Sequence, residues 1–267
     1  MSFDTVVRPS DGVAWITGAS GGIGRATALR LCADGWTVHA TARSLPDLEA
    51  LQREASGGGR IVPAPGDVTD AAAMTAIVAG IIRDGPLALA LLNAGIYTPM
   101  RAEDFRAATA RAMFEVNLGG VANALEPVLA HMIGRRGGHV AITASVAGYR
   151  GLPDAAAYSA TKAGLIAMAE ALAMDLVDLG VRISVINPGF VDTEATSVNT
   201  FQMPFLMPPD EAARRIVDGL KRPGFEIAFP RRFVLLLRLI GALPNRAYIG
   251  AVRRMTGWKD RTDRPAP

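Results

Sequence analysis

Tyr158 and Lys162 are the two residues of this chain whose types and spacing best fit proton transfer. They stand four positions apart on a stretch that is predicted to be helical, so their side chains share one face. A lysine ammonium about 4 Å away, at an effective dielectric of about 20, would favour a phenolate by roughly 4 kcal/mol. That energy would lower a tyrosine pKa from about 10 to about 7, where general acid/base catalysis works best. The pair therefore predicts proton exchange with a carbonyl or an alcohol.

Ser145 is a candidate partner of this pair. It ends a predicted strand upstream of Tyr158, and its hydroxyl could donate a hydrogen bond to a substrate oxygen. A tyrosine and a lysine four residues apart also occur by chance on many helices. The pair therefore gains its meaning from the motifs around it.

A glycine-rich segment, residues 17–24 (TGASGGIG), lies between the first predicted strand and the first predicted helix. Glycines at such a position allow a tight turn, close approach of the backbone to a pyrophosphate, and close packing of the helix on the sheet. The helix N-terminus adds free N–H groups and a partial positive charge. The spacing alone would also fit an ordinary glycine-rich turn, but its place between strand and helix favours a dinucleotide cradle.

The end of the second predicted strand bears on the choice of cofactor. NAD-binding folds usually have an acidic residue there, which accepts hydrogen bonds from the ribose hydroxyls. Here Ala42 leaves room, and Arg43 could pair with a 2′-phosphate and stack on the adenine. NADP(H) is therefore favoured, NAD(H) stays open, and Arg43 could instead be a solvated surface residue. Asp67 and Val68, after the third strand, are placed for the adenine edge.

The elements that must position these residues alternate regularly. Apolar runs predict strands over 13–17, 36–42, 61–65, 87–93, 139–144 and 181–187. Helical spacing predicts helices over 24–33, 46–55, 71–82, 103–131 and 155–178. Because near-continuous apolar runs are typical of strands buried on both faces, we expect an α/β fold with a parallel sheet of about seven strands and helices on both faces. Ligands bind such sheets at the carboxyl ends of the strands, where the motifs lie.

In combination, these motifs resemble those of the short-chain dehydrogenase/reductase family of the TGxxxGxG and YxxxK type. They follow the family's order across residues 12–193, and together they are highly specific. The matching positions are residues 17–24, Asp67-Val68, Asn93-Ala94-Gly95, Asn117, Ser145, Tyr158, Lys162 and the segment 188–193. The resemblance implies a Rossmann-type doubly wound sheet and an NAD(P)-dependent oxidoreductase.

Roles for four residues follow from the resemblance. Tyr158 would act as general acid/base, and Lys162 would bind the nicotinamide ribose while lowering the tyrosine pKa. Ser145 would orient and polarise the carbonyl. Asn117 would hold a water in a proton relay through Lys162.

The other contacts that the resemblance implies surround the cofactor. Gly21 stands where some NADP-using members have a basic residue, which leaves Arg43 as the principal determinant of NADP binding. The implied cofactor-binding residues are Gly18, Ser20, Gly22, Ile23, Gly24, Arg43, Asp67, Val68, Asn93, Ala94, Gly95, Tyr158, Lys162, Pro188, Gly189, Val191 and Thr193.

We expect a single domain, since no linker, repeat or low-complexity tract divides the 267 residues. Residues 1–230 would form the Rossmann-type domain, with a substrate lid over about 194–209, and 231–267 would be a basic and apolar C-terminal extension of it. The apolar lid residues would suit a lipophilic pocket, although plain packing against the domain explains them equally well. They are Phe201, Met203, Phe205, Leu206 and Met207.

The C-terminal extension stands apart in charge. The net charge is +3, yet acidic residues outnumber basic ones up to Leu220 and basic residues predominate after it. Residues 231–243 combine an apolar run with flanking cations, which resembles a helix lying in a membrane interface. The favoured interpretation is packing over the cleft or on a partner subunit. Residues 265–267 and the charged residues before them are expected to be disordered.

Several kinds of partner and site are not expected. Nucleic-acid reader motifs and basic residues interleaved with stacking aromatics are missing. The histidines and the single cysteine, Cys32, lack the spacing of metal ligands, and Cys32 is expected in the core. With a polar N-terminus and no apolar run long enough to cross a bilayer, the protein is expected to be cytoplasmic, with peripheral membrane association left open. The resemblance implies a homodimer or homotetramer built on helices 103–131 and 155–178.

Three functions remain in competition. The leading hypothesis is an NADPH-dependent enzyme that transfers hydride between the cofactor and a lipophilic carbonyl or alcohol. The first alternative is reduction of 3-oxoacyl thioesters on acyl carrier protein or CoA, for which Arg101, Arg106 and Arg150 would offer a cationic rim. The second is a non-catalytic NADP(H)-sensing protein. Such proteins usually lose the tyrosine or the lysine, and both are present here.

Overall fold

The computed structural model describes residues 6–199 and 203–257, and these residues form one sheet of 7 parallel strands in the order β3-β2-β1-β4-β5-β6-β7. The predicted doubly wound parallel sheet is thereby confirmed. The strands are β1 (Val13–Thr17), β2 (Thr37–Thr41), β3 (Arg60–Pro63), β4 (Leu87–Leu92), β5 (Gly138–Thr143), β6 (Val181–Pro188) and β7 (Glu226–Phe229).

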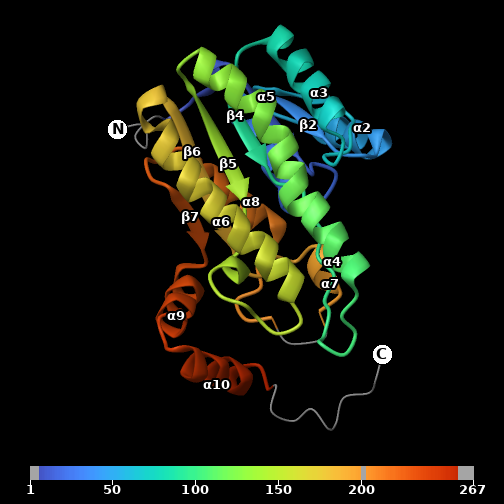
Figure 1. Cartoon of the computed structure of the whole chain (residues 1–267). Helices are drawn as coiled ribbons and strands as arrows, with labels where there is room; N and C mark the ends of the chain where they lie inside the picture. The colour runs from blue at the N-terminus through green and yellow to red at the C-terminus, as the bar shows by residue number, and fades with distance from the viewer. Residues whose placement is uncertain (1–5, 200–202, 258–267) are drawn as a thin grey trace.

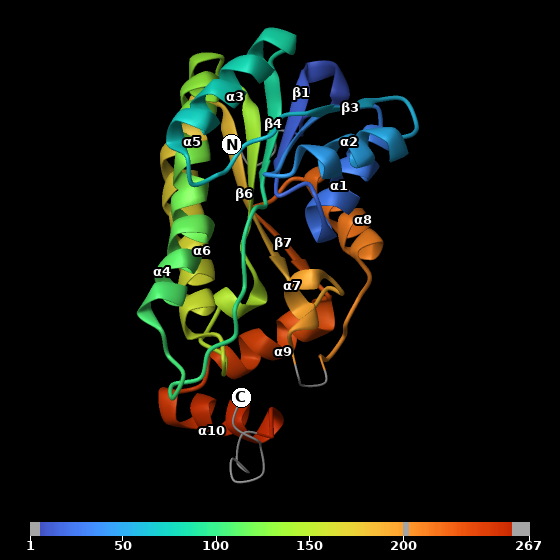
Figure 2. The same cartoon turned by 90° about the vertical axis from the view of Figure 1, so that its right-hand side faces the viewer.

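Helices cover both faces of this sheet, as Figures 1 and 2 show. One face packs against α1, α2 and α8, and the other against α3, α5 and α6. The helices are α1 (Gly22–Ala33), α2 (Leu45–Glu54), α3 (Ala71–Asp84), α4 (Ala107–Phe114), α5 (Gly120–Gly134), α6 (Ala156–Leu176), α7 (Glu194–Ser197), α8 (Pro209–Leu220), α9 (Arg231–Gly241) and α10 (Asn245–Met255).

The central strands are buried along their whole length. Every residue of β1, β4, β5 and β6 is buried, which explains why these strands read as apolar runs rather than as an alternating pattern. Cys32 lies on α1 and is fully buried in the hydrophobic core between this helix and the sheet, as expected. The predicted strands differ from the observed ones by only one or two residues at their ends.

The long helix predicted over 103–131 is wrong in two respects. It begins only at Ala107, because the preceding segment runs beside the start of α6, where Met100 N donates to the Asp154 carbonyl at 2.8 Å. It is also interrupted by a π-helical turn, Glu115–Gly119, before α5 continues to Gly134. Such turns concentrate at functional sites because they re-aim a side chain.

The C-terminal half contains elements that the strand and helix patterns did not outline. Helix α8 and strand β7 complete the sheet layer after the lid, and α10 follows α9. The segment 194–209, predicted to form a lid, begins with the short helix α7, directly after Thr193. Residues 265–267, expected to be disordered, and Phe201 of the lid lie outside the described residues.

The two C-terminal helices, α9 and α10, lie beyond the carboxyl ends of the strands, on the same side as α7 and the start of α6 (Figures 1 and 2). Helix α9 continues directly from β7. Within residues 6–199 and 203–257, no helix is both long enough and apolar enough to cross a bilayer.

Candidate active site

The turn from β1 into α1 is shaped by its glycines. Gly18 has a φ of +69°, and a Cβ on it would lie 2.8 Å from the Ala94 Cα. A Cβ on Gly24 would lie 2.2 Å from the Gly18 carbonyl oxygen, whereas one on Gly21 would meet nothing within 4 Å. Helix α1 begins without a side-chain cap, so the N–H groups of its first turn are free to face a ligand. The space beside Gly21, the close backbone contacts at Gly18 and Gly24, and the free N–H donors of α1 fit a bound pyrophosphate.

Asn93, at the end of β4, braces this turn. Its side-chain amide donates to the Thr17 carbonyl at 3.3 Å and to the Gly18 carbonyl at 3.4 Å. In return, the Thr17 hydroxyl accepts from the backbone N–H groups of Asn93 at 3.0 Å and Ala94 at 3.1 Å. The cradle is therefore held to the neighbouring strand end by hydrogen bonds from both sides.

The ends of β2 and β3 shape the opposite end of the cleft. Ala42 is buried, and Arg43 is exposed at the rim of the cleft. The Asp67 carboxylate accepts hydrogen bonds of 2.9 Å from the backbone N–H and the hydroxyl of Thr69. These bonds lower the pKa of Asp67, and the charge of Arg43 adds to the effect. A cationic guanidinium thus lies at the wall where a dinucleotide's ribose would reach.

The residues expected to handle the proton meet at the start of α6. Ser145 follows β5, and Tyr158 and Lys162 lie one turn apart on α6. The Lys162 ammonium is 3% exposed, lies 5.5 Å from the centroid of the Tyr158 ring, and donates to the Thr143 carbonyl at 2.8 Å. The predicted shared face of the helix is confirmed, and β5 supplies the partner for the lysine.

Burial controls the acidity of both groups. It raises the pKa of Tyr158 to about 12, while the hydrogen bond with Ser145 acts in the opposite direction. Burial also lowers the pKa of Lys162 to about 8. The expectation that Lys162 brings the tyrosine pKa to about 7 is wrong for this geometry, because the loss of hydration outweighs the attraction of an ammonium that is directed toward Thr143.

Asn117 lies in the π-helical turn and is fully buried. Its Oδ1 accepts from the Ile96 N–H at 2.8 Å, and its Nδ2 donates to the Ile96 carbonyl at 3.0 Å and to the Thr161 hydroxyl at 3.1 Å. The side chain does not line the cleft. It fastens the loop after β4 to α6, and the π-helical turn is what aims it there.

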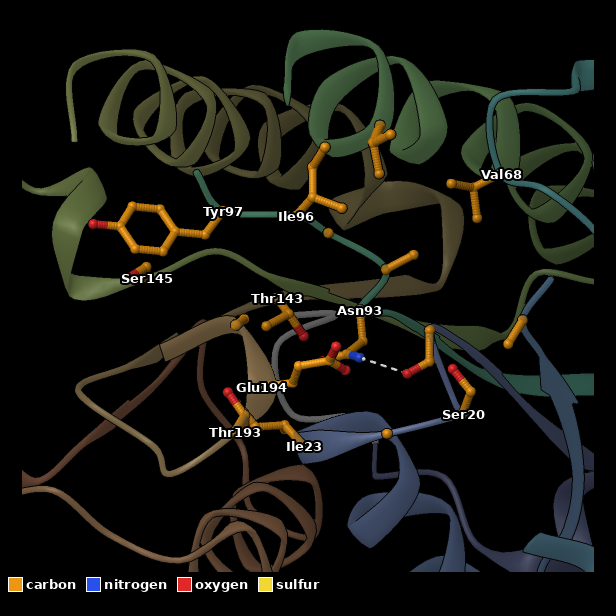
Figure 3. A pocket seen from close by; sticks show the side chains of 18 of the residues that line it. Ser20, Ile23, Val68, Asn93, Ile96, Tyr97, Thr143, Ser145, Thr193 and Glu194 are labelled. Atoms are coloured by element: carbon orange, nitrogen blue, oxygen red, sulfur yellow. Dashed lines mark hydrogen bonds between the residues drawn. The ribbon is translucent and has the colours of Figure 1, made fainter. Parts of the chain in front are cut away.

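All these strand ends open into one cleft of about 420 Å³. Figure 3 shows Ile23, Thr193 and Glu194 along one wall, and Val68, Ile96 and Tyr97 along the other. Every predicted site residue except Gly24 and Asn117 lines this cleft. Gly24 instead allows α1 to pack closely against the Gly18 backbone. Lining residues that neither the motifs nor the predicted lid indicated are Thr41, Gly66, Ile96, Val116, Thr143 and Ala144. Glu194, Ala195 and Thr196 also line the cleft, and they lie in the segment 194–209 that was expected to form the lid.

Tyr97 connects Tyr158 to Asn199 in the segment 194–209, the predicted lid. The Tyr97 ring lies edge-on to Tyr158, with ring centroids 4.9 Å apart, and its hydroxyl donates to Asn199 Oδ1 at 3.3 Å. A parallel bridge between Val191 and Met207 closes the base of the lid. Burial raises the pKa of Tyr97 to about 12, so its hydroxyl stays protonated at neutral pH.

Tyr149 and Arg150, on the loop that follows Ser145, connect this loop to β7 and to the C-terminal helices. Tyr149 donates to Glu226, which also pairs with Arg238 of α9. The Arg150 guanidinium donates to the Gly241 carbonyl at 2.6 Å and to Asn245 Oδ1 at 2.8 Å. The loop after Ser145 is therefore bound to α9 and α10.

Two of the three arginines considered for a cationic rim have partners within the chain. Arg150 is engaged as described, and its guanidinium stacks on the ring of Tyr248, 4.1 Å from the centroid. Arg101 lies 3.8 Å from the Asp154 carboxylate. Arg106 remains exposed at the start of α4. Among the residues that the structure describes, no group of three or more His, Cys, Asp or Glu side chains could bind a metal ion.

The chain is similar to several known proteins over most of its length. A family model described as short chain dehydrogenase matches residues 12–203. The chain is 40% identical over 244 residues to an uncharacterised oxidoreductase of Myxococcus xanthus, covering 91% of this chain and 96% of that protein. It is 35% identical over 191 residues to a 3-oxoacyl-acyl-carrier-protein reductase of Thermotoga maritima, covering 69% and 76%.

A solved structure adds the cofactor class. An alcohol dehydrogenase of Thermococcus sibiricus in complex with 5-hydroxy-NADP superposes with a TM-score of 0.74 at 29% identity, covering 81% of this chain and 95% of that one. Nicotinamide cofactor binding and oxidoreductase activity follow from this likeness together with the family match. The chain belongs to the short-chain dehydrogenase/reductase family.

Proposed function

We propose that this protein is an NADPH-dependent reductase of lipophilic ketones or aldehydes, with Tyr158 as the proton donor. One observation supports it above all: the phosphate cradle, Arg43 and the Ser145–Tyr158–Lys162 group line the same cleft. A cofactor lying across the cradle would bring its reactive end to the tyrosine. The reverse reaction, alcohol oxidation, uses the same groups.

The protein's part in the chemistry is to orient the substrate and to move a proton. A nicotinamide cofactor bound in the cleft supplies the hydride. The Ser145 hydroxyl orients the carbonyl oxygen and polarises it by a hydrogen bond. Tyr158 keeps its proton at neutral pH, because its pKa is about 12, and releases it to the oxygen as negative charge develops there. The Lys162 ammonium stabilises the tyrosinate that remains.

Asn117 is best assigned as a positioning residue. Its side chain is occupied by Ile96 and Thr161, and it fixes the loop that presents Ile96 and Tyr97 to the cleft. A water relay through this residue would require a contact other than these three.

NADP(H) is the proposed cofactor. Arg43 offers a bidentate cation for a 2′-phosphate, and Ala42 leaves that wall without a carboxylate. The likeness to an alcohol dehydrogenase complexed with 5-hydroxy-NADP points the same way. NAD(H) has no 2′-phosphate and would therefore offer Arg43 no anionic partner.

A lipophilic substrate is proposed because apolar side chains surround the catalytic tyrosine. Ile96, Tyr97 and Val191 line the cleft, and the base of the lid packs through Met207. An apolar lining favours burial of apolar surface and leaves Ser145 and Tyr158 to select a carbonyl oxygen.

A second candidate is reduction of 3-oxoacyl thioesters, which the likeness to the Thermotoga maritima enzyme favours. Against it, Arg150 is engaged by α9 and α10, and Arg101 lies near Asp154. An acidic carrier would therefore find fewer available cations at this rim. A non-catalytic NADP(H)-sensing role is not proposed, because Ser145, Tyr158 and Lys162 are all in place.

The test is a screen of NADPH and NADH oxidation over lipophilic ketones, aldehydes and 3-oxoacyl thioesters. Tyr158→Phe should lower kcat by about 10²- to 10⁴-fold, since it removes only the proton donor. NADPH binding, followed by cofactor fluorescence, should stay within a few-fold of wild type and so shows that the cleft remains intact. Turnover at the wild-type rate in this variant would overturn the mechanism.

A further inference from the structure

The C-terminal helix pair, α9 and α10, presents a row of exposed apolar side chains. On α9, Leu235 is 60% exposed and Leu239 is 63% exposed, and their spacing places them on one face. Leu243 follows at 37%, and Ile249 on α10 is 55% exposed. Exposed apolar residues that share one face, as Leu235 and Leu239 do, mark an interaction surface more often than scattered single ones.

This exposure is imposed by the fold. The opposite faces of the two helices are buried through Phe233 and Val234 on α9 and through Tyr248 and Val252 on α10. Phe233 packs near the Phe205 ring of the lid, with centroids 5.7 Å apart. With their inner faces anchored in this way, the helices cannot turn their leucines inward.

Cations frame the apolar row. Exposed arginines stand at both ends of the helix pair, and no acidic residue occurs between Glu226 and Asp260. Arg238 is paired with Glu226. The other arginines of the pair are Arg231, Arg232, Arg246, Arg253 and Arg254.

We propose that the C-terminal helix pair docks on the surface of an anionic lipid bilayer, with its leucines in the acyl boundary and its arginines among the headgroups. An anionic leaflet offers an apolar layer for the leucines and negatively charged phosphates for the arginines. A second copy of the chain fits less well, because a symmetric contact would bring the same arginines face to face. The helices lie in the surface plane, since neither could cross the bilayer.

Docking would also orient the cleft, and this part rests on the proposed function. The helix pair lies beyond the carboxyl ends of the strands (Figure 2). Val146, which follows Ser145, packs against Phe233 and Val234 of α9. The loop after Ser145, the substrate loop, and the base of the predicted lid therefore contact α9, and a lipophilic carbonyl compound would reach the cleft from the membrane.

The experiment is co-flotation of the full-length protein with vesicles of phosphatidylcholine, alone or mixed with phosphatidylglycerol. We expect binding to the anionic vesicles only, weakened by added salt. Leu235→Gln/Leu239→Gln should lower the partition coefficient at least about tenfold, because both side chains lose their apolar contact. Arg246→Gln/Arg253→Gln should reduce the preference for phosphatidylglycerol.

Met174→Gln is the matched control, since Met174 is 72% exposed near the far end of α6 and should leave vesicle binding unchanged. Thermal melting and NADPH binding of each variant show that the fold is kept and do not depend on the docking. The proposal is overturned if the wild type does not float with anionic vesicles, or if the leucine variant floats as the wild type does. A third result also overturns it: the wild type forms an oligomer that does not bind vesicles, and the leucine variant dissociates this oligomer.

Discussion

The Lys162 ammonium lies 5.5 Å from the centroid of the Tyr158 ring, yet its hydrogen bond goes to the Thr143 carbonyl, 2.8 Å away. The lysine is thus held at the end of β5 while the tyrosine, one helical turn earlier, faces the cleft. Lys162 is buried and Tyr158 is half-buried, and the lost hydration keeps the proton on the tyrosine far above neutral pH and removes the charge of the lysine near pH 8.

Reduction and oxidation should therefore differ in their pH dependence. A tyrosine with a pKa of about 12 is ready to donate its proton throughout the neutral range, but it must first lose that proton to act as a base. We expect kcat/KM for alcohol oxidation to rise by up to about tenfold per pH unit between about pH 7 and 9. Carbonyl reduction should change little below about pH 8. An oxidation profile that is already level at pH 7 would contradict the raised pKa.

The depressed pKa of Lys162 also predicts a pH-dependent stability. Between about 8 and 10.5 the unfolded chain binds a proton at this lysine that the folded chain does not, so the unfolding free energy should increase as the pH rises. The whole effect is on the order of 3 kcal/mol. Lys162→Met keeps the length of the side chain and should abolish this increase. Urea unfolding of both proteins between pH 7.5 and 10 measures it, and parallel curves for the two would count against the shift.

Arg43 should decide between the two nicotinamide cofactors. Arg43→Gln removes a charge-assisted contact to a 2′-phosphate and should raise the KM for NADPH by about 10- to 100-fold. The KM for NADH should change by no more than a few-fold. Ala42→Asp is the companion variant, since a carboxylate at that wall should repel the 2′-phosphate and favour NADH. Equal effects of Arg43→Gln on both cofactors would make Arg43 a general surface cation.

Asn117→Ala should destabilise the loop after β4. The substitution leaves the partly buried N–H and carbonyl of Ile96 without their partner, which costs up to about 1–3 kcal/mol for each unsatisfied group. We expect a lower Tm together with a reduced kcat, because Tyr97 on the same loop packs on Tyr158. Thr161→Val removes only one of the three hydrogen bonds of Asn117 and should have the smaller effect. An unchanged Tm in Asn117→Ala would disprove the positioning role.

Arg150→Ala should loosen the C-terminal helices from the substrate loop. The guanidinium bonds the end of α9 and the start of α10 and stacks on Tyr248, and alanine replaces none of these contacts. Hydrogen exchange in α10 should accelerate and kcat/KM for the carbonyl substrate should change, while NADPH binding stays constant. Arg246→Ala, which removes an exposed arginine from the same helix, serves as the control. Equal exchange in both variants would rule out the anchoring role of Arg150.

Short-range patterns in the sequence were enough for the sheet and most of the cleft. A strand buried on both faces must be apolar along its length, as β4 is, and residues four apart on a helix must share a face, as Tyr158 and Lys162 do. The phosphate cradle could also be predicted from the sequence, because only glycine suits the positive φ at Gly18 and the tight contact at Gly24. These features depend on neighbours in the chain, and therefore the sequence by itself determined them.

Tertiary packing decided what these residues do with one another. Three contacts join parts of the chain that are distant in the sequence. They are the hydrogen bonds of Lys162 with the Thr143 carbonyl, of Asn117 with the Ile96 backbone, and of Arg150 with Asn245 of α10. The pKa of Tyr158 likewise depends on hydration lost to surrounding elements, so an estimate from helical spacing alone had the wrong direction. The burial of Phe233 and Val234 and the exposure of Leu235 and Leu239 on α9 were settled in the same way, by packing against the loop after Ser145. Local spacing fixes neighbours along an element, whereas desolvation and long-range hydrogen bonds exist only once the elements have packed.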